Sequence, residues 1–492
     1  MRMKKVFSTL LATTMIATMV TGCGSDADTS TNSTDDTKQD VEQTAEQEDG
    51  EEVSSDSGEE EVTITLGIWP EDTLTEDIAM HEGFVEKMKE LYPNVTCEPS
   101  YYKYSTDTFM PMVEAGTVPT IFESWFTEPK KLIKNEAVAD ITDELEARGW
   151  LDKMNPSIKE LLSDEKGRVY GIPRDGYALG LMLNVELFEE AGLVDDDGYP
   201  IYPKTWDELA ETAKTIKEKT GSAGFCLLAK DGAGGWHFSN IAWGFGATLT
   251  TDNGDGTYTA HLDSDEAIKA MEYVKSLRWD YDVLTADPTN EDWGTGFMQL
   301  GTGGAAMYIA ANDAVNQPTQ VNGLPVEKLA MCPIPAGPSG QYSLYGGTPY
   351  FFSKDATSAE INAALDYLEI MGKAPVATED AIAGMEADAQ NKASEGVPVL
   401  KRFPCWAAQD VLDAEAQVVE KYGNVDPKMF QSYFDAAAGD GLRLEEPGKT
   451  QKMYDELTKV LQEVVTNQDA DVAALMKTAN DNYQTILDSD EE

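Results

Sequence analysis

The pattern of apolar and polar side chains changes twice near the start of the chain. Residues 6–20 form a mostly apolar run of fifteen residues behind a basic start, whereas residues 24–61 contain no aromatic residue and only two large apolar side chains, Val41 and Val53. From Val62 onward, apolar residues return at the spacings of strands and helices. Because a segment that buries little apolar surface cannot offset its chain entropy, we expect residues 24–61 to be disordered and the folded part to begin at 62.

The folded part opens with an alternating strand at 62–70, a helix at 78–91 with apolar residues at helical spacing, and a second strand that runs toward Tyr101. This order predicts parallel strands, and sheets of that kind bind ligands at the carboxyl ends of their strands. Trp69 and Tyr101 fall at those ends. We therefore expect an α/β fold with a ligand crevice lined by aromatic residues.

One stretch organises the middle of the chain. A short strand at 169–173 is followed by the turn-prone tripeptide 174–176 and by a second apolar run at 177–183. Because glycine and proline interrupt regular structure, we interpret the tripeptide as a crossing of the chain between two lobes. Further on, Thr205 and Glu208 match a capping box, which predicts that a helix begins there.

The order of motifs around this crossing resembles one family. The sequence YGIP is followed by an Asn, by LFEEAGL, by a proline and by TWDEL. This order is similar to that of the extracellular solute-binding proteins of ABC importers, in the sugar-binding group that resembles maltose-binding protein. The resemblance covers roughly residues 62–490, although Thr120 stands where the family usually has Asp and the segment 301–308 lacks the family's lysine.

This resemblance implies an α/β, two-lobe periplasmic-binding-protein-like fold of type II, in which each lobe is a mostly parallel sheet flanked by helices and a hinge joins the lobes. It places lobe 1 at residues 62–174 and 304–351, and lobe 2 at residues 175–303 and 352–490 with the C-terminal helices. It also implies a monomeric receptor that captures a carbohydrate between closing lobes and delivers it to the permease subunits of an ABC transporter, without a cofactor.

The N-terminus predicts export and a lipid anchor. Residues 1–22 have the basic start and short apolar core of a signal peptide, and the core is too short to span a bilayer comfortably. The tetrapeptide at 20–23 matches the lipobox of bacterial lipoproteins, in which Cys23 is acylated, and the alternative is a plain secretory signal. Residues 23–61 would then be the lipidated cysteine and an acidic tether, which places the protein outside the cytoplasm at the cell membrane.

The charge excludes one class of partner. The formal net charge is −52, and residues 62–492 hold 33 basic and 74 acidic side chains, a net −41. Because such a surface repels phosphate backbones, we expect no nucleic-acid partner. The remaining cysteines are too far apart for a metal-ligand pattern, so either disulfides or buried free thiols remain open. They are Cys97, Cys226, Cys332 and Cys405.

The predicted binding site consists of aromatic residues at strand ends and lobe edges, with polar neighbours. A flat aromatic face matches the apolar face of a sugar ring, and charged side chains form hydrogen bonds with its hydroxyls. Because acids outnumber cations among the loops concerned, we predict a neutral oligosaccharide with Trp125 or Trp236 as a stacking platform. The ligand-binding candidates are Trp69, Glu71, Tyr101, Glu123, Trp125, Asp175, Tyr177, Trp236, His237, Trp243, Trp293, Tyr345 and Arg402.

Two other classes stay open, a cell-surface glycan-acting enzyme and an adhesin. A glycoside hydrolase needs two carboxylates, but acids are so plentiful here that no pair stands out. The three histidines, His81, His237 and His261, lack the spacing of a zinc site or a catalytic triad. The acidic turn at 252–257 lacks the ligand order of an EF-hand. We therefore expect no catalysis and no bound metal.

Overall fold

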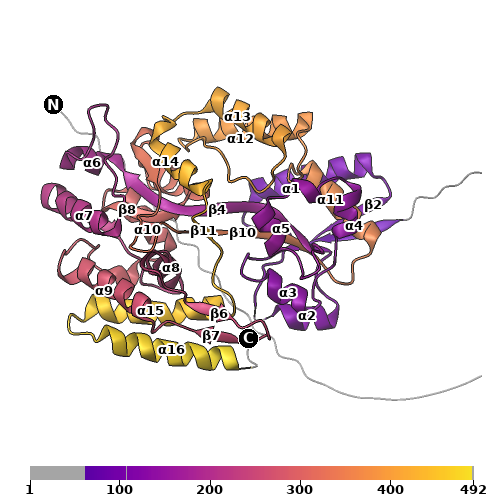
Figure 1. The fold of residues 1–492 in the computed structure, drawn as a ribbon. Coiled ribbons are helices and arrows are strands. Elements are labelled where there is room, and N and C mark those ends of the chain that lie inside the picture. Colours follow the sequence, from indigo (N-terminus) through magenta and orange to yellow (C-terminus); the bar gives the residue numbers. More distant parts are fainter. Residues whose placement is uncertain (1–60, 107, 490–492) are drawn as a thin grey trace, which may run out of the picture. The chain divides into compact units, whose positions relative to one another are not determined.

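The computed structural model of the protein describes residues 61–106 and 108–489 (Figure 1). The predicted signal peptide, Cys23 and nearly all of the acidic tether lie outside the described residues. Within the described ranges, no helix is both long and apolar enough to cross a membrane. Strands and helices alternate along much of this part of the chain, which confirms the predicted α/β class.

Among the described residues, nine strands form one sheet. Seven of them follow the order β2-β1-β3-β10-β4-β8-β5, with β11 beside β10 and β9 beside β4, while β6 and β7 form a separate hairpin. The strands are β1 (Val62–Leu66), β2 (Val95–Pro99), β3 (Ile121–Glu123), β4 (Gly171–Asn184), β5 (Ala223–Cys226), β6 (Thr250–Asp252), β7 (Tyr258–Ala260), β8 (Ala305–Ala311), β9 (Leu329–Cys332), β10 (Ser343–Phe352) and β11 (Leu442–Arg443).

The ends of the sheet are parallel and its middle is antiparallel. The strand β1 pairs in parallel with β2 and with β3, and β5 pairs in parallel with β8. The long strands β4 and β10 run antiparallel to each other, and each is antiparallel to its outer neighbour on the path, β8 and β3. The strand, helix and strand predicted at the start of the folded part are confirmed, since α1 joins β1 to its parallel neighbour β2.

The predicted crossing is a continuous strand. The tripeptide 174–176 was expected to form a turn, but it lies inside the 14-residue strand β4 and pairs with β10. The register shifts between Thr348 and Pro349, so Arg174 is an extra residue on the β4 side. A β-bulge of this kind accommodates an extra residue and bends the strand without ending it. The residues of the tripeptide favour a turn, but pairing with β10, which lies far away in the sequence, keeps them in an extended strand.

Helices cover the sheet (Figure 1). At the start of α7, the Thr205 hydroxyl accepts a hydrogen bond from the Glu208 N–H at 3.1 Å, which confirms this half of the predicted capping box. The Glu208 carboxylate accepts from the Lys204 N–H at 2.7 Å instead of the Thr205 N–H that a capping box requires. The α-helices are α1 (Thr75–Leu91), α2 (Phe109–Ala115), α3 (Pro129–Lys134), α4 (Thr142–Ala147), α5 (Pro156–Leu161), α6 (Val185–Ala191), α7 (Trp206–Thr220), α8 (Ala233–Phe245), α9 (Asp265–Trp279), α10 (Trp293–Gly301), α11 (Ser358–Ile370), α12 (Glu379–Ser394), α13 (Gln409–Tyr422), α14 (Lys428–Ala437), α15 (Thr450–Thr466) and α16 (Val472–Asp488).

Two large hydrophobic cores divide the described chain. The first core joins β1, β3 and the helices up to α5 with the end of β10 and with α11. The second core joins the end of β4, α6 to α9, β8 and the C-terminal helices α15 and α16. This division differs from the predicted lobe boundaries, because β8 packs in the second core and α11 in the first. The reason is topological, since β8 pairs with the second half of β4, and α11 packs against α1 and β1.

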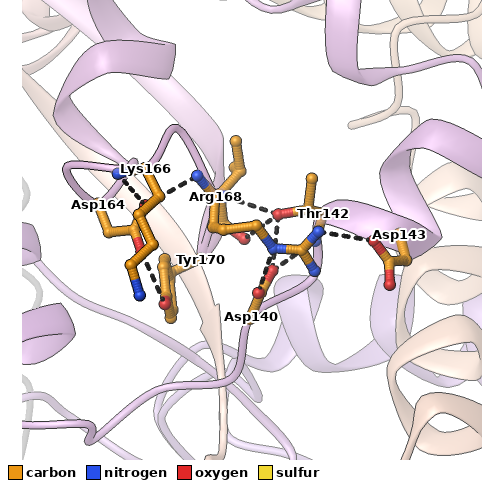
Figure 2. Close-up of polar contacts among 8 residues, drawn as sticks. Asp140, Thr142, Asp143, Asp164, Lys166, Arg168 and Tyr170 are labelled. Atoms are coloured by element: carbon orange, nitrogen blue, oxygen red, sulfur yellow. Dashed lines mark hydrogen bonds and ion pairs between the residues drawn. The ribbon is translucent and has the colours of Figure 1, made fainter.

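A polar network fixes the chain just before β4 (Figure 2). The Arg168 guanidinium donates to Asp140 at 2.5 Å and to Asp143 at 2.8 Å, and the Thr142 hydroxyl accepts from the Val169 N–H at 2.8 Å. Burial alone would raise the pKa of Asp140, but hydrogen bonds from Arg168 and Thr142 lower it below its ordinary value. These contacts tie the chain entering β4 to the start of α4, so the crossing strand begins from a fixed point.

Candidate ligand-binding site

An ion-paired arginine lies at the centre of the crossing. Arg174, the bulge residue of β4, contacts Glu123 of β3 at 2.7 Å and its neighbour Asp175 at 2.6 Å. Burial opposes the charge, but Asp175 and Glu123 raise the pKa of Arg174 above its ordinary value. A second oxygen of Asp175 accepts a hydrogen bond from the Thr348 N–H of β10 at 3.1 Å. The two predicted acids Glu123 and Asp175 are therefore both neutralised by one guanidinium.

A second group of acids surrounds Tyr177. Burial, followed by the charges of Glu445, Asp313 and Asp175, raises the pKa of the half-buried Tyr177 hydroxyl. Burial and then Asp175 raise the pKa of Asp313 to about 6, although this residue is exposed to solvent. Neither Asp313 nor Glu445 has a cationic partner among the described residues.

Glu445 is the less solvated of these two acids. Burial raises the pKa of its carboxyl group to about 7, with a further contribution from Glu128, while a hydrogen bond from the Tyr454 hydroxyl at 2.9 Å acts in the opposite direction. Glu128 itself accepts hydrogen bonds from Tyr104 and Thr127 at 3.0 and 3.1 Å. Carboxylates of the first and second halves of the chain thus come within electrostatic reach of one another beside the crossing.

Three predicted aromatic residues come together here. The rings of Tyr177 and Trp236 lie 6.3 Å apart, and those of Trp236 and Trp293 lie 5.5 Å apart, both edge to face. Trp236 lies in the first turn of α8, and Trp293 begins α10, where 37% of its surface is exposed. Because Trp236 is half-buried and Trp293 is exposed, this group offers a partly exposed aromatic wall beside Tyr177.

His237 lies behind this wall. Its ring stacks on Trp236 at 5.1 Å, it is completely buried, and neither ring nitrogen has a hydrogen-bond partner within the described part of the chain. Burial lowers its pKa to about 3, so the ring is neutral. The structure therefore makes His237 a support for Trp236 rather than a side chain that presents a polar group at the surface.

Other predicted residues lie on the side of the first core. Trp125 is 40% exposed and packs edge to face on Tyr104 at 5.3 Å. Trp69, at the carboxyl end of β1, packs edge to face on His81 at 5.4 Å. Tyr101 and Glu71 are exposed. Trp125 thus offers a second exposed aromatic face, next to the β3 residue Glu123.

Three predicted residues are packed against protein. Trp243 is only 1% exposed, and its indole N–H donates to Glu446 at 2.7 Å. Tyr345 is 3% exposed and stacks on Phe403 at 4.7 Å, and its hydroxyl has no hydrogen-bond partner in the described ranges. Arg402 pairs with Asp388 and Glu415 of α12 and α13 at 3.5 and 3.9 Å. The structure does not bring these three into the group around Tyr177 and Trp236.

The residues of this group that the sequence reasoning missed are Asp313, Glu445 and Glu128. Asp313 follows the carboxyl end of β8, a position that the strand-end rule covers, but the preceding glycine run drew attention instead. Glu445 lies in the segment between β11 and α15, where the sequence has no helical or strand periodicity that could predict its position. Across 61–106 and 108–489, no three acidic, histidine or cysteine side chains come together as metal ligands. A cavity of about 180 Å³ lies between β4, the start of β10 and the end of α14.

The arrangement of strands and cores is that of two-lobe periplasmic binding proteins. The cyclic α-maltosyl-1,6-maltose binding protein of Arthrobacter globiformis superposes with a TM-score of 0.63 over 87% of this chain and 98% of its own, at 19% identity. UgpB of Mycobacterium tuberculosis, solved with glycerophosphocholine, gives a TM-score of 0.64 over 88% and 99%, at 14% identity. At these identities the likeness concerns the fold, and it confirms the two-lobe class implied by the motifs.

The family follows from the sequence match. Residues 72–377, more than half of the chain, match the model of the bacterial extracellular solute-binding proteins, and the chain therefore belongs to this family. A binding protein of Brucella abortus (strain 2308) is 28% identical over 235 residues, which are 46% of this chain and 52% of that protein. The chain thus matches about half the length of this curated relative. Family membership implies that the protein binds a solute outside the cytoplasm.

Proposed function

We propose that this protein is a receptor that captures an uncharged oligosaccharide between its two lobes and delivers it to the permease of an ABC transporter. The observation that carries the proposal is the pairing of partly exposed aromatic faces, at Trp125, Trp236 and Trp293, with carboxylates that have no cationic partner among the described residues. A sugar-binding site needs aromatic faces and hydrogen-bond acceptors together, because a sugar ring has an apolar face and its hydroxyls donate hydrogen bonds. We further propose that acylation of Cys23 anchors the receptor and that it acts without catalysis.

The charge of the site supports an uncharged ligand. The Arg174 guanidinium is bound to Glu123 and Asp175 at 2.7 and 2.6 Å, so it has little capacity left for an anionic ligand. Asp313 and Glu445 add acceptors without cations. An anionic sugar would therefore approach carboxylates at close range, where repulsion is poorly screened.

Calorimetry with maltotetraose, cellotetraose, xylotetraose, tri-galacturonate and glycerophosphocholine tests the proposal. We expect one of the neutral glycans to bind with an affinity that changes little between low and high salt. Trp236→Ala should weaken that binding roughly tenfold or more, as expected for the loss of an aromatic contact of ~1.5 kcal/mol with its buried area. Trp279→Ala, a half-buried tryptophan of α9, is the matched control and should bind like the wild type.

The other outcomes are equally informative. Binding of tri-galacturonate alone, with a steep loss of affinity in high salt, would contradict the uncharged ligand and keep the receptor role. Binding of glycerophosphocholine alone would exclude an oligosaccharide. Hydrolysis of a glycan by the purified protein would contradict the receptor role itself.

A further inference from the structure

Trp125 is an exposed aromatic residue just after β3, and the backbone on both sides of it is bound to β10. The Ser124 N–H donates to the Pro349 carbonyl at 3.2 Å. The Phe126 N–H donates to the Gly347 carbonyl at the same distance, 3.2 Å. Because side chains alternate between the two faces of an extended chain, Ser124 and Phe126 are buried while Trp125 is 40% exposed. The backbone therefore fixes the origin of the Trp125 side chain, but not the direction in which its ring is turned.

The ring of Trp125 packs against Tyr104. The centroids of the two rings lie 5.3 Å apart and their planes meet at 81°, an edge-to-face arrangement. Tyr104 is only 6% exposed, and its ring also packs on Phe109 of α2 at 5.2 Å. Edge-to-face pairs have a preferred geometry, so a ring that is itself held by the core favours one orientation of its neighbour. Tyr104 belongs to the first core and offers Trp125 such a ring.

The hydroxyl of Tyr104 is bound to the same turn that carries Trp125. The Glu128 N–H donates to the Trp125 carbonyl at 3.1 Å, which closes a turn over residues 125–128. The Tyr104 hydroxyl donates to the Glu128 carboxylate at 3.0 Å, and the second carboxylate oxygen accepts from the Thr127 hydroxyl at 3.1 Å. Burial, followed by the charge of Glu128, raises the pKa of the Tyr104 hydroxyl, so it keeps its proton and remains a donor.

Tyr104 therefore contacts this turn at two points. Its ring packs against the Trp125 ring, and its hydroxyl is bound to the carboxylate of Glu128, which is 6% exposed. A displacement of Tyr104 would leave this buried carboxylate with one donor fewer, which is costly for a charged group removed from water. The hydrogen bond thus holds the Tyr104 ring in place, and the Tyr104 ring in turn limits the orientations open to Trp125.

We propose that Tyr104 is a positioning residue of the ligand site, which holds the Trp125 ring in the orientation that stacks on a sugar. This inference rests on the proposed function and adds a residue that acts through Trp125 without touching the ligand. A ring that is already held in its bound orientation loses less conformational freedom when the ligand arrives, so more of the stacking free energy contributes to affinity. The Tyr104 ring supplies the orientation, and its hydrogen bond to Glu128 keeps that ring in place.

Two substitutions and a matched control test the inference by calorimetry with maltotetraose, cellotetraose and xylotetraose. Tyr104→Leu removes the ring contact, and should weaken the binding of whichever sugar the wild type binds by about threefold to tenfold, the size of an aromatic pair. Tyr104→Phe keeps the ring and should retain most of the affinity. Tyr483→Leu, at a completely buried tyrosine of the second core, is the control and should leave the affinity unchanged. Equal affinity of Tyr104→Leu and the wild type would overturn the inference.

A double substitution separates positioning from a general effect on the fold. Because Tyr104 acts through Trp125, Tyr104→Leu should weaken binding no further in a protein that already carries Trp125→Ala. Additive losses in the double variant would overturn the inference, since Tyr104 would then act by another route. Wild-type affinity of Trp125→Ala alone would also overturn it, because the Trp125 ring would then make no contact with the sugar.

Fluorine NMR of the sugar-free protein distinguishes failure of this inference from failure of the proposed function. The chain has nine tryptophans, so labelling with 5-fluorotryptophan gives nine signals, and Trp125→Phe identifies that of Trp125. Fluorine relaxation reports the motion of the ring on the picosecond to nanosecond timescale. Tyr104→Leu should increase this motion at Trp125, whereas Tyr104→Phe and Tyr483→Leu should not, and the signal of Trp279 should relax alike in all variants.

The two readouts fail independently. If none of the three sugars binds the wild type, the uncharged ligand is wrong, and the relaxation of the Trp125 signal then decides whether Tyr104 holds its ring. Equal relaxation of that signal in Tyr104→Leu and the wild type would overturn the inference, whatever the ligand.

Discussion

The carboxyl groups of Asp313 and Glu445 change their charge within the ordinary range of environmental pH. Burial raises their pKa values to about 6 and about 7, respectively. Retaining such groups costs stability when they are ionised, because the folded protein solvates the carboxylate less well than water does. Residues of this kind are frequent where a ligand supplies the missing hydrogen bonds, which agrees with their position beside Tyr177.

Glu445→Gln should therefore stabilise the protein in a pH-dependent way. The folded pKa of Glu445, about 7, lies above the ordinary 4.5, so the folded state holds the proton more tightly and stability falls as the pH rises through about 7. Gln accepts the Tyr454 hydrogen bond without a charge. The gain in melting temperature of the variant over the wild type should thus be larger above pH 7 than below pH 4.5. Glu218→Gln, exposed on α7, is the control, and parallel pH profiles for Glu445→Gln and the wild type would contradict this assignment.

Single side chains were predictable where strand ends or helix starts determine their place. Trp236 and Trp293 lie in the first turns of two helices and contact each other, as aromatic residues at lobe edges were expected to do. Trp243 follows Trp236 by two helical turns, yet it is buried and bound to Glu446, which comes from a segment 203 residues away. The sequence around an aromatic residue does not reveal such a distant partner. The sequence therefore could not predict which of the aromatic side chains are exposed and which are buried.

At the level of secondary structure, glycines allow β4 and β10 to lie close together. A Cβ added to Gly347 would lie 2.5 Å from the Asp175 carbonyl oxygen and 2.8 Å from the Phe126 ring. The Asp175 oxygen is held because β4 pairs with β10 here, and Phe126 is held because its N–H donates to the Gly347 carbonyl at 3.2 Å. The paired glycine is therefore a steric requirement of the crossing.

Gly347→Ala should destabilise the protein by about 1–3 kcal/mol, the usual cost of overpacking a tight site. Chemical denaturation followed by tryptophan fluorescence measures this change. Gly384→Ala is the matched control, because nothing lies within 4 Å of its added Cβ and the residue is inside α12. There, alanine should stabilise the helix by up to about 1 kcal/mol. Equal midpoints for Gly347→Ala and the wild type would show that the two strands can separate without cost.

Elements were predictable where local signals and distant pairing agree. The β1, α1 and β2 unit and the Thr205 cap depend on residues close in the sequence, and both were anticipated. The tripeptide 174–176 has turn-forming residues, but the pairing of residues 175 and 176 with residues 347 and 348 of β10 extends the strand through it. The lobe boundaries also depend on distant pairings, of β8 with β4 and of α11 with α1, which no local pattern contains.

At the scale of the whole molecule, the two cores also meet away from the crossing strands. The turn of the β6–β7 hairpin, whose strands flank the second core, approaches α3 of the first, since a Cβ on Gly256 would lie 2.7 Å from the Lys134 ammonium. Hydrogen bonds from Thr257 and, more weakly, the charge of Lys134 lower the pKa of Asp255 in this turn. Because this contact joins α3 of the first core to the hairpin beside the second core, we expect it to favour a closed arrangement of the lobes.

Lys134→Glu should shift the protein toward an open arrangement, because it places like charges at this contact. We expect a larger radius of gyration in solution scattering and weaker sugar binding, although residue 134 is outside the proposed site. A ligand that prefers the closed form should reduce the radius of gyration of the wild type. Lys214→Glu, exposed in the middle of α7, carries the same change of charge and should do neither. No change in scattering at ligand saturation would exclude closure.

The division of the first core between distant segments also has a consequence for how the protein is made. Its strands β1 to β3 end at Glu123, but β10 and α11, which complete the core, begin about 220 residues later at Ser343. During synthesis, the first core therefore cannot be completed until the segment that contains β10 and α11 has been made. Long-range pairing of this kind slows folding. A chain that stays unfolded for that interval can still be threaded through a secretion channel, so the topology that joins the two lobes is compatible with the export that we propose for this protein.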